Sequence, residues 1–187
     1  MEKLKVAVIG TGHLGAIHTK LWKACDAAEL TGIYDVDSAR ASQIASDNGV
    51  VAFDSLETLL DNCDAVTIAS PTIYHYEIAE KCIKAGKHCL IEKPITSTYE
   101  QAQKLIALAE EHKSLVQVGH VERFNPAIAA LSGHKLSPVF IEAHRLSQFR
   151  PRATDVSVIH DLMIHDIDIM LWLVKSKVAK IEANGVA

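Results

Sequence analysis

The sequence has no long hydrophobic run and no excess of positive charge. Its longest late apolar run, Ile169 to Val174, is far shorter than the roughly 20 residues that a membrane-spanning helix needs. Lys and Arg number 19 against 23 Asp and Glu, which gives a formal net charge of -4. No basic field therefore attracts nucleic acid or an anionic membrane surface. We expect neither a nucleic-acid-binding protein nor a membrane protein.

Cysteine is also scarce, and the four that occur show no C-x-x-C spacing: Cys25, Cys63, Cys82 and Cys89. Such cysteines in an intracellular chain stay reduced, so we interpret them as small core residues and expect neither a disulfide nor a zinc site. The first residues, MEKLKVAVIG, enter a strand-like run without the apolar region of a signal peptide. A cytoplasmic location is the resulting expectation.

About half of the residues are apolar, and short apolar runs alternate with segments of helical period. Strands are predicted near 5–10, 29–35, 50–52, 65–69, 87–92 and 115–119, and helices near 14–25, 38–48, 74–85 and 97–112. Very apolar strands joined by crossover helices are typical of a parallel sheet covered on both faces. Residues 1–120 are therefore predicted to form a doubly wound α/β domain, the Rossmann fold.

The pattern changes after Gly119. A Pro-bearing helix at FNPAIAALSG precedes an alternating strand at PVFIEAHRLSQFR, a helix through IHDLMIHDIDIMLWLV and a last strand at KVAKIEANGVA. A sheet of only these two strands would have exposed edges and would need further strands to be stable. We expect 121–187 to be the start of a truncated α+β domain that serves substrate binding and oligomerisation.

A glycine-rich loop follows the first predicted strand in VAVIGTGHLGAIH. In G-x-G-x-x-G, Gly10 permits the tight turn, Gly12 the close approach of a pyrophosphate, and Gly15 the packing of helix on strand. The N–H groups of the helix start receive the anion. The pattern indicates a dinucleotide site, although a glycine turn in another nucleotide or flavin fold is the alternative.

Asp35 ends the second strand, twenty residues beyond Gly15. A carboxylate there accepts hydrogen bonds from the adenosine ribose hydroxyls and repels a 2′-phosphate, which favours NAD over NADP. Arg40 lies within reach of that ribose in the sequence, and a solvated helix arginine is the other interpretation of it.

A lysine stands at the end of a buried strand in HCLIEKPIT. An ammonium group that loses water there needs an anionic or reacting partner. Glu92 could hold Lys93 in place, and the bond before Pro94 is a candidate for the cis form. The alternative is a solvated lysine at a strand end.

The chain resembles the Gfo/Idh/MocA family of NAD(P)-dependent oxidoreductases, which act mainly on sugars and cyclitols. The resemblance rests on the glycine loop, Asp35, the step from Thr72 to His75, AGKHCLIEKP, GHVERFNP and the late D-x-x-x-H. It covers essentially the whole chain. FRPRATDVSVIHDLMIHDID looks most like the branch that oxidises C3 of UDP-N-acetylglucosamine, although Val156 to Asp161 replaces the glycine run of many relatives.

The resemblance implies that Lys93 lies at the reacting carbinol, that His165 is the general base and that Asp161 orients it. On a helix Asp161, His165 and Asp168 share one face of an apolar segment. Two alternatives are a satisfied core histidine and a metal held by these three residues. We expect no metal, and His160 lies five residues from His165, off that face.

The other expected site residues fall into two groups. The cofactor is expected to contact Gly10, Gly12, His13, Leu14, Gly15, Asp35, Ser70, Pro71, His75, Glu92 and Lys93. The substrate is expected to contact Arg123, Arg145, Arg150 and Arg152, since a nucleotide sugar needs cationic donors for its diphosphate, and Asn125, which lies just past the sixth predicted strand. The alternative is that these arginines are solvated or pair with acids. His18 and His144 are interpreted as packing or surface residues.

Taken together, the motifs and the family resemblance imply an NAD-dependent dehydrogenase of a sugar or nucleotide sugar, and the resemblance makes C3 of UDP-N-acetylglucosamine the first choice. The alternatives are an inositol-type cyclitol dehydrogenase and a dinucleotide-binding module or inactive fragment without turnover. Family relatives use the second domain's sheet to assemble, so the resemblance also implies a homo-oligomer.

Overall fold

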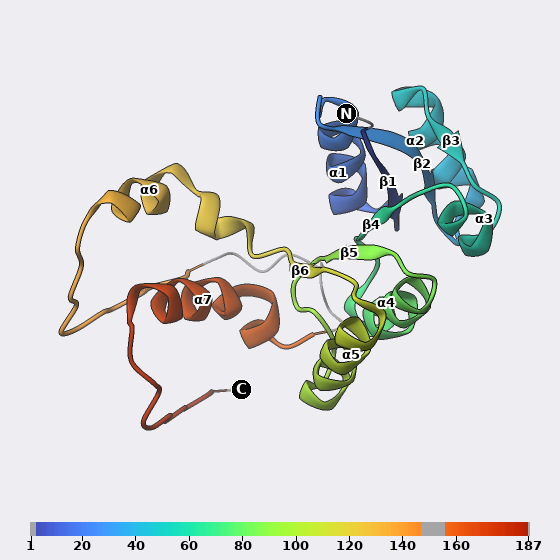
Figure 1. Ribbon diagram of the computed structural model, residues 1–187. Helices are drawn as coiled ribbons and strands as arrows, with labels where there is room; N and C mark the ends of the chain where they lie inside the picture. The colour runs from blue at the N-terminus through green and yellow to red at the C-terminus, as the bar shows by residue number, and fades with distance from the viewer. Residues whose placement is uncertain (1–2, 147–155, 187) are drawn as a thin grey trace.

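The computed structural model describes residues 3–146 and 156–186. Its sheet has six parallel strands in the order β3-β2-β1-β4-β5-β6 (Figure 1). They are β1 (Leu4–Ile9), β2 (Ala28–Tyr34), β3 (Val51–Ala52), β4 (Ala65–Ile68), β5 (His88–Ile91) and β6 (Val116–Val118). The predicted doubly wound parallel sheet is confirmed, including its short third strand.

Helices cover both faces of this sheet. They are α1 (His13–Lys23), α2 (Ser38–Asn48), α3 (Leu56–Leu60), η1 (Thr72–Tyr74), α4 (His75–Lys84) and α5 (Tyr99–His112). The sequence patterns predicted all of them except the short α3 and the single 3-10 turn η1. Local chemistry sets the helix ends: Thr98 and Gln101 form a capping box at the start of α5, and the Asp37 side chain caps α2.

The core divides into two clusters because successive residues of a strand point to opposite faces. Ala7 and Ile9 of β1 pack with side chains of α3, α4 and α5 in the larger cluster. Val8, between them, packs in the smaller cluster with Ala45 of α2 and is flanked by Trp22 of α1. The predicted core cysteines Cys63, Cys82 and Cys89 are buried in the larger cluster, whereas Cys25 is half-buried; all four are free thiols.

The region after β6 contains η2 (Val121–Phe124), α6 (Pro126–Ala129), η3 (Ala130–Gly133), the π-helical turn η4 (Ile159–Met163) and α7 (Ile164–Leu173). Figure 1 shows that it extends away from the sheet. The predicted helices are present here, but the two predicted strands are wrong for residues 138–146 and 177–186, which form no strand. Residues 147–150 of the first lie outside the described residues.

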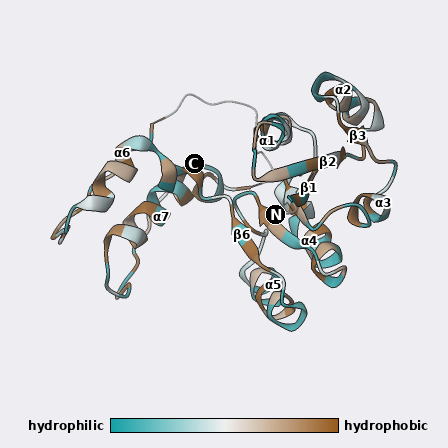
Figure 2. Cartoon of the chain, turned by 45° about the horizontal axis from the view of Figure 1, so that its top comes forward, coloured by the Kyte–Doolittle hydropathy of each residue, from teal (hydrophilic) through white to brown (hydrophobic). Residues whose placement is uncertain are grey.

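The physical reason is that a strand needs a neighbour for its N–H and C=O groups. No strand lies beside either segment within 3–146 and 156–186, and the alternating apolar side chains are open to solvent, with Val139, Phe140 and Ile181 at least four-fifths exposed. The β part of the predicted α+β region is therefore absent from the described residues, where the regular structure is helical and the stretches between the helices are irregular (Figure 2). None of the helices described is long and apolar enough to cross a membrane.

Replacing Leu105 by Ala should lower the free energy of unfolding by about 2–5 kcal/mol, because this side chain of α5 is 1% exposed and its loss leaves a cavity. The neighbouring Ile106 is 57% exposed, so Ile106→Ala should change stability by less than about 1 kcal/mol. Urea denaturation of both variants measures the difference. Equal effects would contradict the assignment of this helix face to the core.

Candidate active site

The candidate site lies along the carboxyl edge of the sheet, where the strands end in register. Ile9 pairs with Ile68, and Ile68 pairs with Ile91. The N–H groups of the next residues continue the ladder, from Ala69 to the Ile9 carbonyl and from Glu92 to the Ile68 carbonyl. Ligands of open α/β sheets bind at this edge, where the strand order reverses between β1 and β4.

The glycine loop has the close packing that its spacing predicts. Gly10 has φ +88°, and a Cβ there would lie 2.6 Å from the Ser70 nitrogen after β4. A Cβ on Gly15 would lie 1.8 Å from the Gly10 carbonyl oxygen. A Cβ on Gly12, in contrast, would meet no atom of the described residues within 4 Å. Gly10 and Gly15 are thus needed by the protein itself, whereas Gly12 leaves open a space that a pyrophosphate fits.

The start of α1 suits an anion. Gly12 is its N-cap, no side chain caps the free N–H groups, and no acidic residue stands in the first turn. His13 and Leu14, both expected at the cofactor, are exposed here. Free N–H groups beside an open space are what a pyrophosphate requires, so the residues present fit a dinucleotide.

Asp35 is fixed at the end of β2 by three hydrogen bonds. One carboxylate oxygen accepts from the Thr11 N–H at 2.6 Å and from the Thr11 hydroxyl at 2.9 Å, and the other accepts from the Asp37 N–H at 2.9 Å. Burial opposes ionisation of this carboxyl, but the N–H bonds from Asp37 and Thr11 outweigh burial and lower its pKa. Arg40 pairs with Asp37 at 2.9 Å rather than extending toward Asp35. Sequence reasoning missed Thr11, since G-x-G does not specify its middle residue.

His75, one of the residues expected to contact the cofactor, is enclosed by protein groups. It is 1% exposed, with Nδ1 2.9 Å from the Pro94 carbonyl oxygen and Nε2 2.8 Å from that of Ser70. The imidazole therefore joins the loops that follow β4 and β5, while Pro71 is exposed. The bond between Lys93 and Pro94 is cis, as hypothesised from the sequence.

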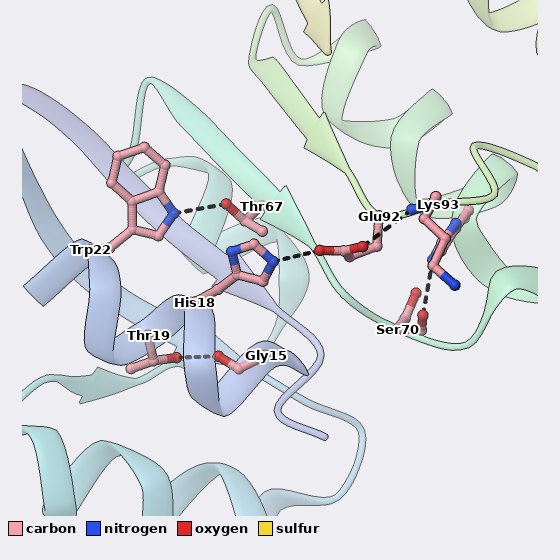
Figure 3. Close-up of polar contacts among 9 residues, drawn as sticks. Gly15, His18, Thr19, Trp22, Thr67, Ser70, Glu92 and Lys93 are labelled. Atoms are coloured by element: carbon pink, nitrogen blue, oxygen red, sulfur yellow. Dashed lines mark hydrogen bonds and ion pairs between the residues drawn. The ribbon is translucent and has the colours of Figure 1, made fainter. Parts of the chain in front are cut away.

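Lys93 has the anionic partner that its position requires. The side chain is 15% exposed, and its Nζ donates to the Asp161 carbonyl oxygen at 2.7 Å and to the Asp161 carboxylate at 3.2 Å. Glu92 contacts the backbone of Lys93 instead, because its Oε2 accepts from the Lys93 N–H at 3.2 Å. Its other oxygen lies 2.7 Å from the His18 imidazole (Figure 3). His18 is thus part of the site's framework and not merely a packing or surface residue.

His165 lies half-buried at the start of α7. Burial lowers the pKa of its imidazole, and the nearby positive charges of Lys93 and Arg145 lower it further. Its Nδ1 is buried and has no hydrogen-bond partner among the described residues. The expected orientation by Asp161 is not what the structure shows, since the Asp161 carboxylate faces Lys93. The helix changes from π to α between the two residues, which alters the predicted one-face spacing.

Asp168, the third polar residue of this segment, accepts two hydrogen bonds from the Arg123 guanidinium, one of them at 2.7 Å from Nε. The His120 Nδ1 lies 3.9 Å from the same carboxylate. Asp161, His165 and Asp168 do not form a metal cage, because the described residues contain no group of three or more His, Cys, Asp and Glu that could hold an ion.

The predicted substrate residues have the following places. Arg145 donates two hydrogen bonds to Asp166, at 2.6 and 2.7 Å. Asn125 caps α6 through its Oδ1 and donates to Glu122 through Nδ2. Arg150 and Arg152 lie outside the described residues. Arg123 and Arg145 each use Nε and Nη2 in these pairs, which leaves the Nη1 hydrogens for a ligand.

A Gly12→Ala variant should keep its melting temperature yet bind NAD roughly tenfold more weakly, the equivalent of about 1.4 kcal/mol, because its methyl group occupies only the space left for the ligand. Gly15→Ala should lose stability as well, because its methyl group overlaps the Gly10 carbonyl. Differential scanning fluorimetry and calorimetric titration separate the two effects. Unchanged NAD affinity in Gly12→Ala would show that the cofactor does not occupy this space.

Known proteins match this chain in sequence and in fold. Residues 4–120 match the oxidoreductase family with the NAD-binding Rossmann fold, Gfo/Idh/MocA. UDP-N-acetylglucosamine 3-dehydrogenase of Acidithiobacillus ferrooxidans is 41% identical over 100% of this chain and 59% of its own length. A solved structure of that enzyme superposes with a TM-score of 0.94, over 100% of this chain and 62% of the solved chain. Inositol 2-dehydrogenase of Rubrobacter xylanophilus is 32% identical over 98% of this chain and 56% of its own.

The chain therefore spans about three fifths of the length of these curated relatives. The match to the family covers the whole glycine loop, Asp35, Glu92 and Lys93, and ends at His120. The resemblance stated from the motifs is confirmed: the chain belongs to the oxidoreductase family with an NAD-binding Rossmann fold.

Proposed function

We propose that this protein oxidises a hydroxyl group of a sugar or nucleotide sugar and delivers the hydride to NAD. The observation that carries the proposal is the contact of Lys93 with Asp161, 68 residues away, beside the half-buried His165 and at the carboxyl edge of the sheet. A directed ammonium and an uncharged imidazole are the two groups that alcohol oxidation needs.

The roles follow from the contacts. Asp161 aims the Lys93 ammonium, which donates a hydrogen bond to the substrate oxygen and stabilises the alkoxide character that develops there. The imidazole of His165, kept neutral by burial and by neighbouring positive charge, accepts the hydroxyl proton. NAD supplies the hydride acceptor when bound.

The choice of NAD over NADP rests on Asp35. Its lowered pKa keeps the carboxylate charged, and that charge repels the 2′-phosphate of NADP. Arg40, the cation that could offset the repulsion, is paired with Asp37. One lone-pair position on the Asp35 Oδ1 is left for a ribose hydroxyl, since among the described residues this oxygen accepts only the Asp37 N–H.

For the substrate we propose UDP-N-acetylglucosamine, oxidised at C3. The support is the 41% identity to a UDP-N-acetylglucosamine 3-dehydrogenase, against 32% for an inositol 2-dehydrogenase. The remaining N–H groups of Arg123 and Arg145 are suited to a diphosphate, with Asp168 and Asp166 holding each guanidinium in place. Asn125, Arg150 and Arg152 complete the proposed substrate set. An inositol-type cyclitol, which has no diphosphate, is the second candidate.

We further infer a homo-oligomer in the cytoplasm. Large apolar side chains after residue 120, among them Phe124, Val139 and Phe140, are at least three-quarters exposed and favour contact with other polypeptide. The free thiols of the core suit a reducing compartment.

The experiment that tests the function measures NADH absorbance when the purified chain and NAD meet UDP-N-acetylglucosamine, other UDP-sugars or myo-inositol. We expect NADH with UDP-N-acetylglucosamine. In Lys93→Ala, turnover should fall about 10²–10³-fold, since a donor to the developing charge is lost, while NAD affinity stays within about threefold. No NADH from any substrate, in a sample that binds NAD, would contradict the proposal, and equal loss of turnover and NAD affinity would remove Lys93 from its role.

Turnover should decline only below about pH 6.5, the ordinary pKa of a histidine, because a proton acceptor whose pKa is lowered stays neutral down to lower pH. The pH profile of kcat checks this, with His165→Gln as the comparison. The variant should have low turnover that no longer varies across this range. A decline centred above pH 7 in the native chain would assign the base to another group.

A further inference from the structure

Glu92 is a buried carboxylate that protein groups contact from three sides. It is 7% exposed. Its Oε1 lies 2.7 Å from the His18 Nε2, and its Oε2 accepts the Lys93 N–H at 3.2 Å. On the third side lies Gly119, where a Cβ would approach Oε2 to 3.1 Å and Oε1 to 3.3 Å. Each carboxylate oxygen of Glu92 therefore has one hydrogen-bond partner among the described residues, His18 for Oε1 and the Lys93 N–H for Oε2.

The three contacts come from different parts of the sheet edge. His18 projects from α1, Lys93 follows β5, and Gly119 follows β6. In Figure 3 the His18 ring lies between α1 and the end of β5 and points to Glu92. Because α1 also carries the glycine loop at its start, Glu92 joins the dinucleotide-binding helix to the backbone of the proposed catalytic lysine.

The helix that supplies His18 is itself fixed to the sheet. One turn further along, the Trp22 Nε1 donates to the Thr67 hydroxyl of β4 at 2.8 Å (Figure 3). One turn earlier, Gly15 is buried against the glycine loop, and the Thr19 hydroxyl donates to its carbonyl at 2.8 Å. His18 therefore lies between two anchored turns, and its ring has little freedom to move away from Glu92.

Burying a carboxylate is costly unless it is paired and hydrogen-bonded. Burial raises the pKa of Glu92, but the hydrogen bond and charge of His18 outweigh burial, so that the pKa is lowered and the group stays ionised. Buried pairs of this kind add little net stability over apolar residues of the same size. Such a pair instead fixes the relative positions of the two side chains and of the elements that carry them.

We propose that the pair of His18 and Glu92 positions Lys93, by holding the backbone N–H of the lysine at a constant place relative to α1. The inference rests on the proposed role of Lys93 at the substrate oxygen. Asp161 holds the ammonium end of Lys93, and Glu92 holds the backbone end. In this proposal His18 and Glu92 act as positioning residues.

Loss of the backbone anchor should act on the chemical step more than on NAD binding. A misplacement of about 1 Å at a reacting group costs roughly 10²-fold in rate. The glycine loop and the free N–H groups of α1 precede His18 in the chain and keep their own contacts. In His18→Ala, kcat should therefore fall about 10–100-fold, while the Kd of NAD stays within about threefold.

His18→Gln provides the rescue. A glutamine amide reaches nearly the place of the imidazole Nε2 and can donate to Glu92, so turnover should return to within about threefold of the native value.

Gly119→Ala provides a second, independent perturbation, since its methyl group must displace the Glu92 carboxylate without altering any polar group. This variant should lower kcat as His18→Ala does. Glu77→Gln, which breaks an exposed pair with Lys81 on α4, is the matched control.

A readout without turnover separates this inference from the proposed function. Acetylation of Lys93 is followed by mass spectrometry, with the exposed Lys104 of α5 as internal reference. Lys93 should react at least about threefold faster in His18→Ala and Gly119→Ala than in the native chain and in Glu77→Gln, because the loosened loop releases its ammonium from Asp161.

The outcomes are distinct. Faster acetylation with full NAD-binding stoichiometry supports the positioning role, even if the native chain oxidises none of the sugars tested. Unchanged acetylation in both variants overturns it, and so does a loss of NAD-binding stoichiometry in parallel with turnover, which would show that the pair only maintains the fold. Melting temperatures measured on the same samples identify any variant that is unfolded at the assay temperature.

Discussion

The common register of the parallel strands is the constraint on which the rest of the site depends. Gly10 donates to the Tyr34 carbonyl, Ala69 to that of Ile9, Glu92 to that of Ile68 and Gly119 to that of Ile91. These bonds place the glycine loop, the buried carboxylate and the lysine after it along one edge, although they come from residues far apart in the chain. A slip of one residue would turn Glu92 to the other face of the sheet and remove it from His18.

Most of the charged side chains described at this edge have a partner of opposite charge. Glu92 pairs with His18, Lys93 with Asp161, and Arg123 with Asp168. In a partly buried site each pair satisfies charges that would otherwise be costly. His165 belongs to none of these pairs among the described residues, and burial together with the surrounding positive charge lowers its pKa. In the proposed reaction, the imidazole of His165 is the group that accepts the proton.

Sequence reasoning succeeded where the decisive signals are local. The strand and helix pattern of residues 1–120, the glycine loop, Asp35 and the need of Lys93 for an anion all follow from short stretches of sequence. It failed where the answer depends on a distant partner. The strands expected after Pro138 need neighbours that the described residues do not supply. His18 was interpreted as a packing or surface residue because its partner, Glu92, lies 74 residues away. Asp161 was expected to orient His165, but its carboxylate contacts Lys93, since a partly buried ammonium needs an anionic partner.

The α/β domain and the region after residue 120 are stabilised by different interactions. The α/β domain has an apolar core on both faces of its sheet. Among its described residues the region after 120 buries only Asp168, and the bonds that fix it are polar: Lys93 to Asp161, Arg123 to Asp168 and Arg145 to Asp166. The Lys93 ammonium donates to the carbonyl and to the carboxylate of Asp161, which leaves its third hydrogen for another acceptor. The position of the Lys93 ammonium is therefore linked to the placement of the helical region, whereas the glycine loop and Asp35 do not use these contacts.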